Sequence, residues 1–399
     1  MPNLETHPRS VLFIAGDVSG DVHSAALART ILAQDRSRAV HALGGRRLRE
    51  IVGESSAGQF LGDTTNCSAI GVLSAIKVYF RCWVLRDSMR RFLKTHRVDA
   101  VVLCDWGGFN GRILPELHAL GIPILYYFPP RSWQRKGRPG LAIAPYVTRV
   151  ATPFEWSAER LRGAGAQAEW VGHPSVENSR TAAERDELRR KFGIGASETL
   201  VALLPGSRVS ELRVLAPKMA KAAELIAKDH PVRFIAVVPK EVAQEARVHL
   251  PPSIPIFTDC ASDLLSASDA AIVKTGTASL EAVLAGIPHV TVYDVSKTLR
   301  AEWCLLWAWR RIPFYAMPNI ILEREVVPEL IGLKCQPRKI ADALNRVMTD
   351  ESIRRRMLDD YALIRQALGS ELPVPATERT AQIVEEMLNE TAIPVALNA

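Results

Sequence analysis

The sequence lacks any long uninterrupted run of apolar residues. Its polar N-terminus leads directly into the five apolar residues Val11–Ala15, which are too few for the core of a signal peptide. No uncharged apolar run approaches the roughly eighteen residues that a membrane-spanning helix requires. We therefore expect no spanning segment, so that any contact with a membrane is peripheral.

Cysteine is scarce, and its spacing is irregular. None of the six cysteines forms a C-x-x-C pair, which argues against a zinc site or a disulfide framework. We expect reduced thiols in a cytosolic protein and no bound metal.

The chain is instead rich in apolar residues and carries a basic excess. Apolar residues make up 48% of its 399 residues, enough to bury two cores. Lys and Arg outnumber Asp and Glu by 50 to 43, which gives a formal charge of +7. This excess suits an anionic partner: nucleic acid, a nucleotide phosphate or an acidic membrane surface.

Short apolar runs alternate with amphipathic stretches along the whole chain, a rhythm typical of parallel sheets with helices on both faces. The expected buried strands are Val11–Ala15, Ala100–Cys104, Pro123–Tyr127, Leu200–Leu204, Phe234–Val238 and Ala270–Val273. Expected helices include Ser24–Gln34, Glu159–Gly163, Glu211–Lys228 and Leu280–Ala285. The rhythm pauses over the polar residues 174–198. We therefore expect two Rossmann-like domains, 1–175 and 176–365, with a C-terminal helix and tail, 366–399, that returns to the first domain.

A glycine turn follows the first expected strand, in Ala15–Asp21. Gly16 and Gly20 allow close approach of a ligand to the backbone, and Ser19 and Asp21 would face it. The three-glycine dinucleotide fingerprint is absent. The same residues also fit a simple strand-to-helix turn in which Asp21 is the N-cap.

Asp105 ends the second expected strand and precedes Trp106-Gly107-Gly108-Phe109-Asn110. Ligands of open α/β sheets bind beyond the carboxyl ends of strands, so this carboxylate is placed to accept a proton from a sugar hydroxyl. A helix cap or a loop ion pair is the alternative.

Two loops in the second half are suited to a nucleoside diphosphate. In the first, the amides of Gly206 and Ser207 and the guanidinium of Arg208 provide contacts for phosphate oxygens. In the second, Gly276 and Thr277 open a helix whose free amides suit a diphosphate, and Glu281 one turn later suits two ribose hydroxyls. Capped helix starts are the alternative for both loops.

The stretch 76–97 mixes aromatic, aliphatic and basic residues, a composition that suits a helix lying on an anionic membrane. A core-facing helix with a solvated basic face is the alternative. The residues expected at the membrane are Val78, Phe80, Trp83, Arg86, Arg90 and Arg91.

In order and spacing, these motifs resemble those of the lipid-A-disaccharide synthases over about residues 10–345. AGDVSGD is similar to the family's AGExSGD, CDWGGFN to IDAPDFN, TPFE at 152–155 to LPFE, and VGHP at 171–174 to IGHP or IGHT. LPGSR with Glu211, KTGTASLE, and MPNI at 317–320, which matches LPNLL, complete the series.

The resemblance implies the GT-B fold, an α/β architecture of two Rossmann-like domains with the active cleft between them. It implies an inverting, metal-independent transfer from UDP-2,3-diacylglucosamine to 2,3-diacylglucosamine 1-phosphate in lipid A (lipopolysaccharide) biosynthesis. The UDP-sugar is a substrate, so no cofactor is expected. Asp105 matches the family's catalytic aspartate; Arg208, Thr277 and Glu281 match its nucleotide site, and Asn319 matches a loop asparagine near the donor.

The resemblance also implies a cytoplasmic protein that is peripheral on the inner face of the cytoplasmic membrane, with 76–97 as the contact. A nucleic-acid partner is not expected, because the basic residues lie beside apolar ones rather than on a recognition helix. A homodimer is left open. A non-catalytic nucleotide-binding protein is the alternative from another class, and the intact Asp105, Arg208, Glu281 and Asn319 argue against it.

The chain departs from the family pattern at three places. Gly108 replaces the second aspartate of IDAPDFN, residues 128–135 (FPPRSWQR) replace SPSVWAWR, and Lys274 replaces a small residue beside the phosphate loop. These departures affect the acceptor assignment more than the UDP site. A GT-B transferase acting on another glycolipid and a UDP-sugar epimerase are therefore the alternative enzymes.

Overall fold

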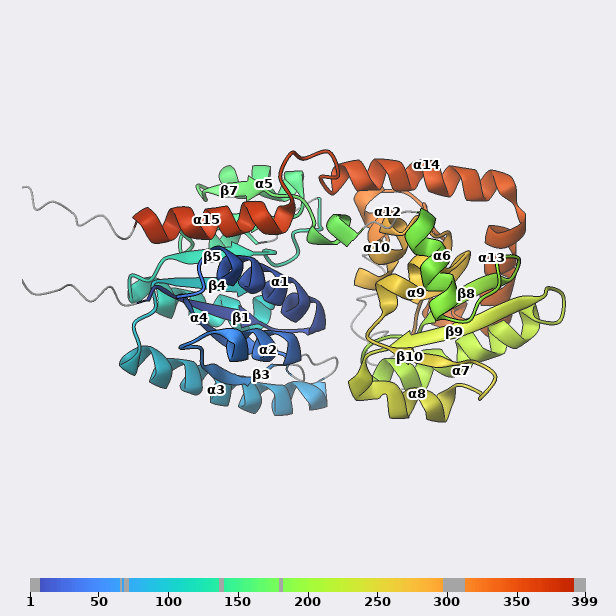
Figure 1. The fold of residues 1–399 in the computed structure, drawn as a ribbon, viewed down its shortest axis with the longest axis horizontal. Coiled ribbons are helices and arrows are strands. Elements are labelled where there is room, and N and C mark those ends of the chain that lie inside the picture. Colours follow the sequence, from blue (N-terminus) through green and yellow to red (C-terminus); the bar gives the residue numbers. More distant parts are fainter. Residues whose placement is uncertain are drawn as a thin grey trace, which may run out of the picture. The chain divides into compact units, whose positions relative to one another are not determined.

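The computed structural model describes residues 8–64, 67, 72–135, 140–178, 182–296 and 313–390 (Figure 1). The chain divides into two compact units. Unit 1 is Met1–Pro174 with Leu368–Ala399, and unit 2 is Ser175–Ala367. The sequence-based boundaries fall at 175/176 and 365/366, within a few residues of these. The last nine residues, expected to be a loose tail, lie outside the described part.

Unit 1 contains a parallel sheet with strand order β3-β2-β1-β4-β5-β6-β7. The central strands β1 and β4 are buried at every residue, as their uninterrupted apolar sequences predict. The described strands are β1 (Ser10–Ala15), β2 (Ala39–Gly44), β3 (Phe60–Asp63), β4 (Ala100–Cys104), β5 (Ile124–Tyr127), β6 (Arg149–Thr152) and β7 (Ala168–Trp170).

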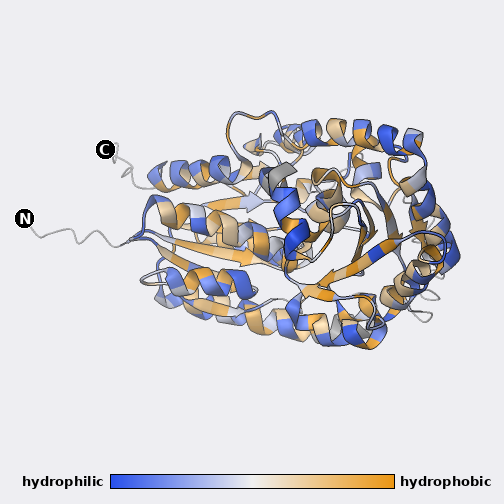
Figure 2. Cartoon of the chain, turned by 45° about the vertical axis from the view of Figure 1, so that its right-hand side comes forward, coloured by the Kyte–Doolittle hydropathy of each residue, from blue (hydrophilic) through white to orange (hydrophobic). Residues whose placement is uncertain are grey.

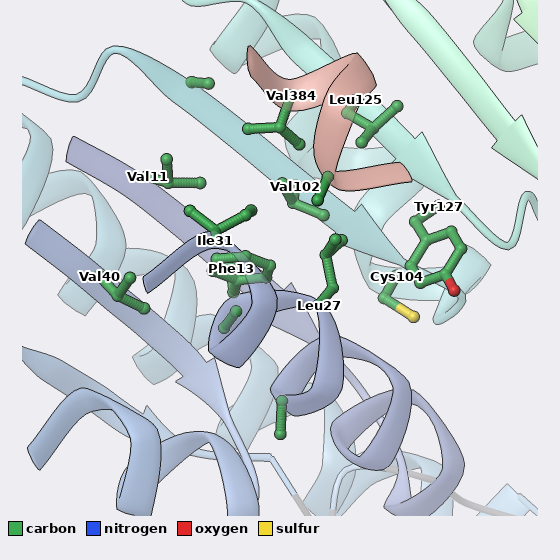
Figure 3. Packing of buried hydrophobic residues seen from close by; sticks show 14 of the residues in the cluster. Val11, Phe13, Leu27, Ile31, Val40, Val102, Cys104, Leu125, Tyr127 and Val384 are labelled. Carbon is green, nitrogen blue, oxygen red and sulfur yellow. The ribbon is translucent and has the colours of Figure 1, made fainter. Parts of the chain in front are cut away.

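Helices cover both faces of this sheet. They are α1 (Val18–Gln34), α2 (Arg46–Glu54), α3 (Val72–Thr95), α4 (Gly107–Ala119), α5 (Glu155–Arg162) and α15 (Ala376–Glu390). On one face, Leu27 and Ile31 of α1 and Val384 of α15 pack over Phe13 and Val102 (Figure 3). Each such side chain contributes about 1.5–3 kcal/mol through burial. This shared core attaches the C-terminal helix to unit 1.

Unit 2 repeats the plan with a parallel sheet of order β10-β9-β8-β11-β12-β13. Its described strands are β8 (Thr199–Leu204), β9 (Val232–Val238), β10 (Ile256–Thr258), β11 (Ala270–Lys274), β12 (His289–Tyr293) and β13 (Glu329–Ile331). Its described helices are α6 (Ala182–Lys191), α7 (Val209–Ile226), α8 (Ala243–His249), α9 (Ala261–Ala267), α10 (Thr277–Leu284), α12 (Met317–Leu322), α13 (Pro337–Thr349) and α14 (Glu351–Ala367). Figure 2 shows hydrophobic strands and helices with mixed surfaces, as expected for this layered architecture.

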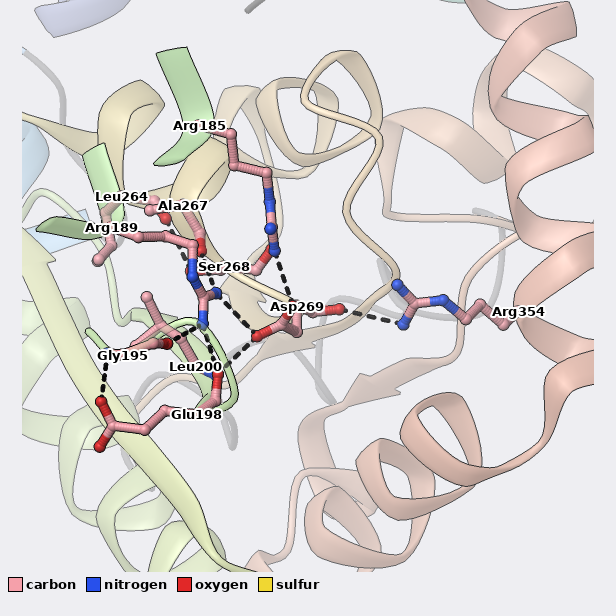
Figure 4. A network of polar contacts seen from close by, with 10 residues as sticks. All are labelled: Arg185, Arg189, Gly195, Glu198, Leu200, Leu264, Ala267, Ser268, Asp269 and Arg354. Carbon is pink, nitrogen blue, oxygen red and sulfur yellow. Dashed lines mark hydrogen bonds and ion pairs between the residues drawn. The ribbon is translucent and has the colours of Figure 1, made fainter. Parts of the chain in front are cut away.

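The polar stretch at which the sequence rhythm pauses includes helix α6. A network of polar contacts holds α6 to the base of β11 (Figure 4). Asp269 accepts hydrogen bonds from Arg185 at 2.7 Å, from Arg189 at 3.2 Å and from the Leu200 amide at 2.8 Å. Arg185 and Arg189 therefore stabilise this helix through ion pairs and hydrogen bonds, together with Leu188, which packs against the core of unit 2.

In each sheet, successive strands are first added on one side of the first strand and then on the other side. The reversal falls between β1 and β4 in unit 1 and between β8 and β11 in unit 2. Loops that follow strands on either side of such a switch point diverge and leave room for a ligand. The four motifs predicted to bind ligands follow these four strands.

Candidate functional site

The glycine turn of unit 1 is built around Asp17, which is the N-cap of α1. Its Oδ1 accepts hydrogen bonds from the Gly20 amide at 2.7 Å and from the Ser19 hydroxyl at 3.1 Å. The alternative that Asp21 caps this helix is wrong. Asp21 instead accepts from the amides of Gly45, Arg47 and Leu48 at 2.7–3.2 Å, and so caps α2. Its buried carboxylate is therefore directed at the neighbouring helix.

Gly16 is needed for packing as well as for the turn. A Cβ atom at this position would lie 1.9 Å from Cγ of Trp106. The indole of Trp106 stacks on the Phe109 ring, with centroids 4.1 Å apart. The two predicted motifs of unit 1 thus meet through Trp106, which occupies the position of a small residue in IDAPDFN.

Asp105 leaves β4 in the left-handed backbone region, with φ of +47°, and Trp106 follows with φ of +46°. Hydrogen bonds hold this conformation: the Asp105 carbonyl accepts from the Tyr126 hydroxyl at 2.7 Å and from Asn110 Nδ2 at 2.9 Å. Non-glycine residues in this region are strained and concentrate at functional sites. The backbone of Asp105 is therefore held in position at the end of β4.

The surroundings of the Asp105 carboxyl group raise its pKa. Desolvation beside the strand ends and, to a smaller extent, the negative charge of Asp17 raise the pKa of Asp105 to about 7, while the Trp106 amide lowers it. By its solvent-accessible surface, however, the residue as a whole is exposed. A carboxyl group with this pKa is suited to accept a proton near neutral pH.

An aromatic cluster that the sequence did not predict lies at the same edge of the sheet. The His23 imidazole stacks on the Phe128 ring at 4.8 Å, and the His173 ring meets His23 edge-on at 5.4 Å. Burial lowers the pKa of His23 to about 4, so this imidazole is neutral near pH 7. Phe128 has φ of +56° and directly follows β5. The available sequence signal was the VGHP motif, which contains His173.

In unit 2, the loop after β8 forms around Glu211, a buried residue in the first turn of α7. Glu211 Oε2 accepts from the Ser207 amide at 3.1 Å, and Oε1 lies 3.5 Å from Nη1 of Arg208. Gly206 has φ of +125°, and a Cβ there would lie 2.5 Å from Glu211. The Ser207 amide, expected to contact phosphate, is therefore occupied by Glu211, whereas the Arg208 guanidinium remains accessible.

Lys274 joins this loop to the second predicted nucleotide motif. Its Nζ lies 3.0 Å from Glu211 Oε1. Because β8 and β11 are adjacent, the loops that follow them meet at this ion pair.

Helix α10 begins with an uncapped turn. Gly276 is the N-cap, with φ of +122° and no side chain to satisfy the first amides. Thr277 is the first residue of the helix, and Glu281 lies one turn later. Desolvation raises the pKa of Glu281 to about 7. Within the described part of the chain, no hydrogen bond or ion pair engages its carboxylate. An open amide cluster beside an unpaired carboxylate suits phosphate and hydroxyl groups on one ligand.

Asn319 has a different environment from the one its motif suggested. It is buried in α12; its Oδ1 accepts from the amides of Val326 and Val327 at 2.8 and 2.9 Å. Its Nδ2 donates to the Val327 carbonyl and to Glu329 Oε1, both at 2.9 Å. These bonds use the full capacity of the amide. Asn319 therefore holds the loop before β13, and its side-chain amide has no hydrogen-bonding capacity left for the sugar donor.

Helix α3 carries the predicted membrane contact. Phe80 is 65% exposed and Trp83 59% exposed, next to exposed Tyr79 and Val84, and Val78 is partly exposed. The three arginines expected to contact lipid phosphates instead form ion pairs within the protein. Arg86 and Arg90 both pair with Glu116 of α4, and Arg91 pairs with Asp87 at 2.9 Å. In the part of the chain that is described, no helix is long and apolar enough to cross a bilayer.

Comparison with known proteins identifies relatives along almost the whole chain. A family model described as lipid-A-disaccharide synthetase matches residues 11–384. A lipid-A-disaccharide synthase of Myxococcus xanthus is 31% identical over 392 residues, covering 96% of this chain and 98% of the relative. One from Syntrophus aciditrophicus is 29% identical, with 96% and 98% coverage.

Solved structures resemble the chain at much lower identity. A UDP-GlcNAc 2-epimerase from Neisseria meningitidis bound to UDP-GlcNAc matches with a TM-score of 0.62 and 13% identity, covering 96% of this chain and 100% of the other. Acinetobacter baumannii MurG matches with a TM-score of 0.55 and 14% identity, covering 95% and 100%. These likenesses establish the GT-B fold alone, and none of them favours an epimerase. Since the family model spans both units and the relatives align from end to end, the chain belongs to the lipid-A-disaccharide synthase family of glycosyltransferases.

Proposed function

We propose that this protein transfers a diacylglucosaminyl group from UDP-2,3-diacylglucosamine to 2,3-diacylglucosamine 1-phosphate. The products are lipid A disaccharide 1-phosphate and UDP. The attacking hydroxyl displaces UDP in one step, so the anomeric configuration inverts, and no metal or cofactor takes part.

The environment of Asp105 carries this proposal. An acceptor hydroxyl is a poor nucleophile at neutral pH, so it must lose its proton as the new bond forms. Asp105 is fixed by its backbone at a switch point and has a pKa of about 7. It takes the hydroxyl proton, while unit 1 provides the acceptor site.

The diphosphate binds to unit 2 at the start of α10, with Arg208 as the countercharge. The amides that follow Gly276 and the positive end of the helix dipole favour anionic oxygens. Thr277 adds a hydroxyl donor, and Glu281 accepts from the ribose hydroxyls. The unpaired state of Glu281 within the described residues supports this assignment.

Peripheral attachment to the inner face of the cytoplasmic membrane is part of the same proposal, because both substrates are acylated. The exposed aromatic residues of α3 enter the interface, and the cations of that helix add attraction to anionic lipid.

The ion pairs to Glu116 make the aromatic residues the better target for a test. The double variant Phe80→Ser, Trp83→Ser should lose co-sedimentation with anionic vesicles. The matched control is Val248→Ser, which replaces a 72% exposed apolar residue of unit 2.

The reaction itself is tested by mass spectrometry of products from UDP-2,3-diacylglucosamine and a panel of glycolipid acceptors. We expect a disaccharide 1-phosphate with 2,3-diacylglucosamine 1-phosphate as acceptor. Transfer to a different glycolipid, with none to this one, would contradict the acceptor assignment and leave the transferase assignment in place.

A further inference from the structure

The nucleotide side of unit 2 contains a cluster of three charges, Arg208, Glu211 and Lys274, here called the β8–β11 charge cluster. Glu211 is 4% exposed, so its carboxylate depends on nearby donors. Lys274 Nζ is the nearer cation, at 3.0 Å from Oε1, and Arg208 Nη1 is farther, at 3.5 Å. The Ser207 amide satisfies Oε2. Lys274 is thus the closer counter-ion of this buried acid.

Two cations share one carboxylate in this cluster, which leaves an excess of one positive charge. The nearby Asp294 does not remove that excess, because it pairs with Lys218 and accepts from the Val295 amide at 2.8 Å. Without the lysine at position 274, Arg208 would be the main counter-ion of Glu211 and the cluster would be neutral. The side chain of Lys274 therefore changes what Arg208 is free to bind.

The location of Lys274 connects this charge balance to the ligand site. It is the last residue of β11, and its Nζ lies 3.7 Å from where a Cβ of Gly276 would stand. The side chain of Arg208 is 38% exposed, so its guanidinium can reach a ligand. The charge balance of the cluster therefore decides how strongly Arg208 attracts an anion at the start of α10.

We propose that Lys274 is a positioning residue that neutralises Glu211 and so leaves the charge of Arg208 available to a nucleoside diphosphate. The inference rests on the proposed nucleotide site of unit 2 and names the residue that sets the charge available there. Lys274 acts through Glu211 and Arg208, and not by holding the phosphates itself.

Titration calorimetry with UDP and with uridine tests this role on four proteins: the wild type, Lys274→Met, Glu211→Gln, and the double variant. In Lys274→Met, the carboxylate of Glu211 is left with Arg208 as its counter-ion. UDP affinity should therefore fall about ten-fold, which corresponds to about 1.4 kcal/mol of lost charge interaction. Uridine affinity stays unchanged because no phosphate is present. Glu211→Gln keeps an acceptor for the Ser207 amide and binds UDP at least as tightly as the wild type. The double variant regains the wild-type UDP affinity.

Three results would overturn the inference. If the double variant binds UDP as weakly as Lys274→Met, Lys274 contacts the diphosphate directly. If uridine and UDP weaken together, Lys274 supports the fold of the site. If Lys274→Met binds UDP normally, the lysine has no role in nucleotide binding. Failure of the proposed function is distinguishable from all three, because the wild-type protein would then not bind UDP.

Discussion

The negative charge of Asp17 should contribute to the pH dependence of catalysis by raising the pKa of Asp105. Desolvation of the carboxyl group is the larger cause of the raised pKa of Asp105 and the charge of Asp17 the smaller one, and together they raise it from 3.8 to about 7. Replacing Asp17 with Asn removes the charge but keeps a good N-cap for α1. A base works only when deprotonated, so activity is lost as the pH falls through its pKa. Asp17→Asn should move this acid limb to lower pH by about one unit, equivalent to about 1.4 kcal/mol.

The assay is kcat measured from pH 5 to 9 with saturating donor. Saturation matters because the pKa of Glu281 is also about 7, and an unsaturated enzyme would report the titration of both groups. Asp35→Asn, at the other end of α1, is the matched control and should leave the acid limb in place. An unchanged limb in Asp17→Asn, or a wild-type kcat that is flat across this range, would refute the reasoning.

Three further predictions follow from the contacts of the site. Glu281→Ala should weaken UDP binding by about 1–3 kcal/mol in calorimetry, whereas the surface control Glu245→Ala should not. If Glu281→Ala binds UDP as tightly as the wild type, Glu281 is not part of the nucleotide site. Gly16→Ala should lower the free energy of unfolding by about 1–3 kcal/mol in denaturant titration because its Cβ would overlap Trp106, and the same substitution should cost less in a Trp106→Ala background. An equal cost in both backgrounds would contradict this packing contact. Asn319→Ala should cost about 1–3 kcal/mol of stability, because it leaves buried backbone groups without partners; a loss of UDP affinity at unchanged stability would instead assign Asn319 to the donor.

The elements that could be predicted are those governed by local sequence. Each of the six expected strands overlaps an observed one, because a short, continuous apolar run between turn residues has few other ways to be buried. The motifs also follow the strands on either side of the switch points, because each motif is adjacent in sequence to its strand. Asp105 could be placed at a strand end for the same reason.

Contacts between distant residues could not be predicted. Asp21 caps a helix that begins 25 positions later, and Glu116 pairs with Arg86 and Arg90 from another helix. Nothing in the local pattern distinguishes a carboxylate that caps its own helix from one that caps a neighbour. The motif of Asn319 suggested a ligand contact, but only the loop geometry reveals that its amide is already satisfied. Tertiary packing therefore decides which polar residues of a motif remain free to bind.

The most direct test of the account is the kinetics of Asp105→Asn with UDP-2,3-diacylglucosamine and 2,3-diacylglucosamine 1-phosphate. Asparagine tolerates the left-handed backbone of this residue, so the variant removes the base and retains the local conformation. Losing a positioned base costs about 10²–10⁴-fold in rate. We predict a fall in kcat of at least about 100-fold with unchanged UDP affinity, because the proposed nucleotide site lies on unit 2. A variant that keeps more than about a tenth of the wild-type kcat would contradict the assignment of Asp105 as the catalytic base.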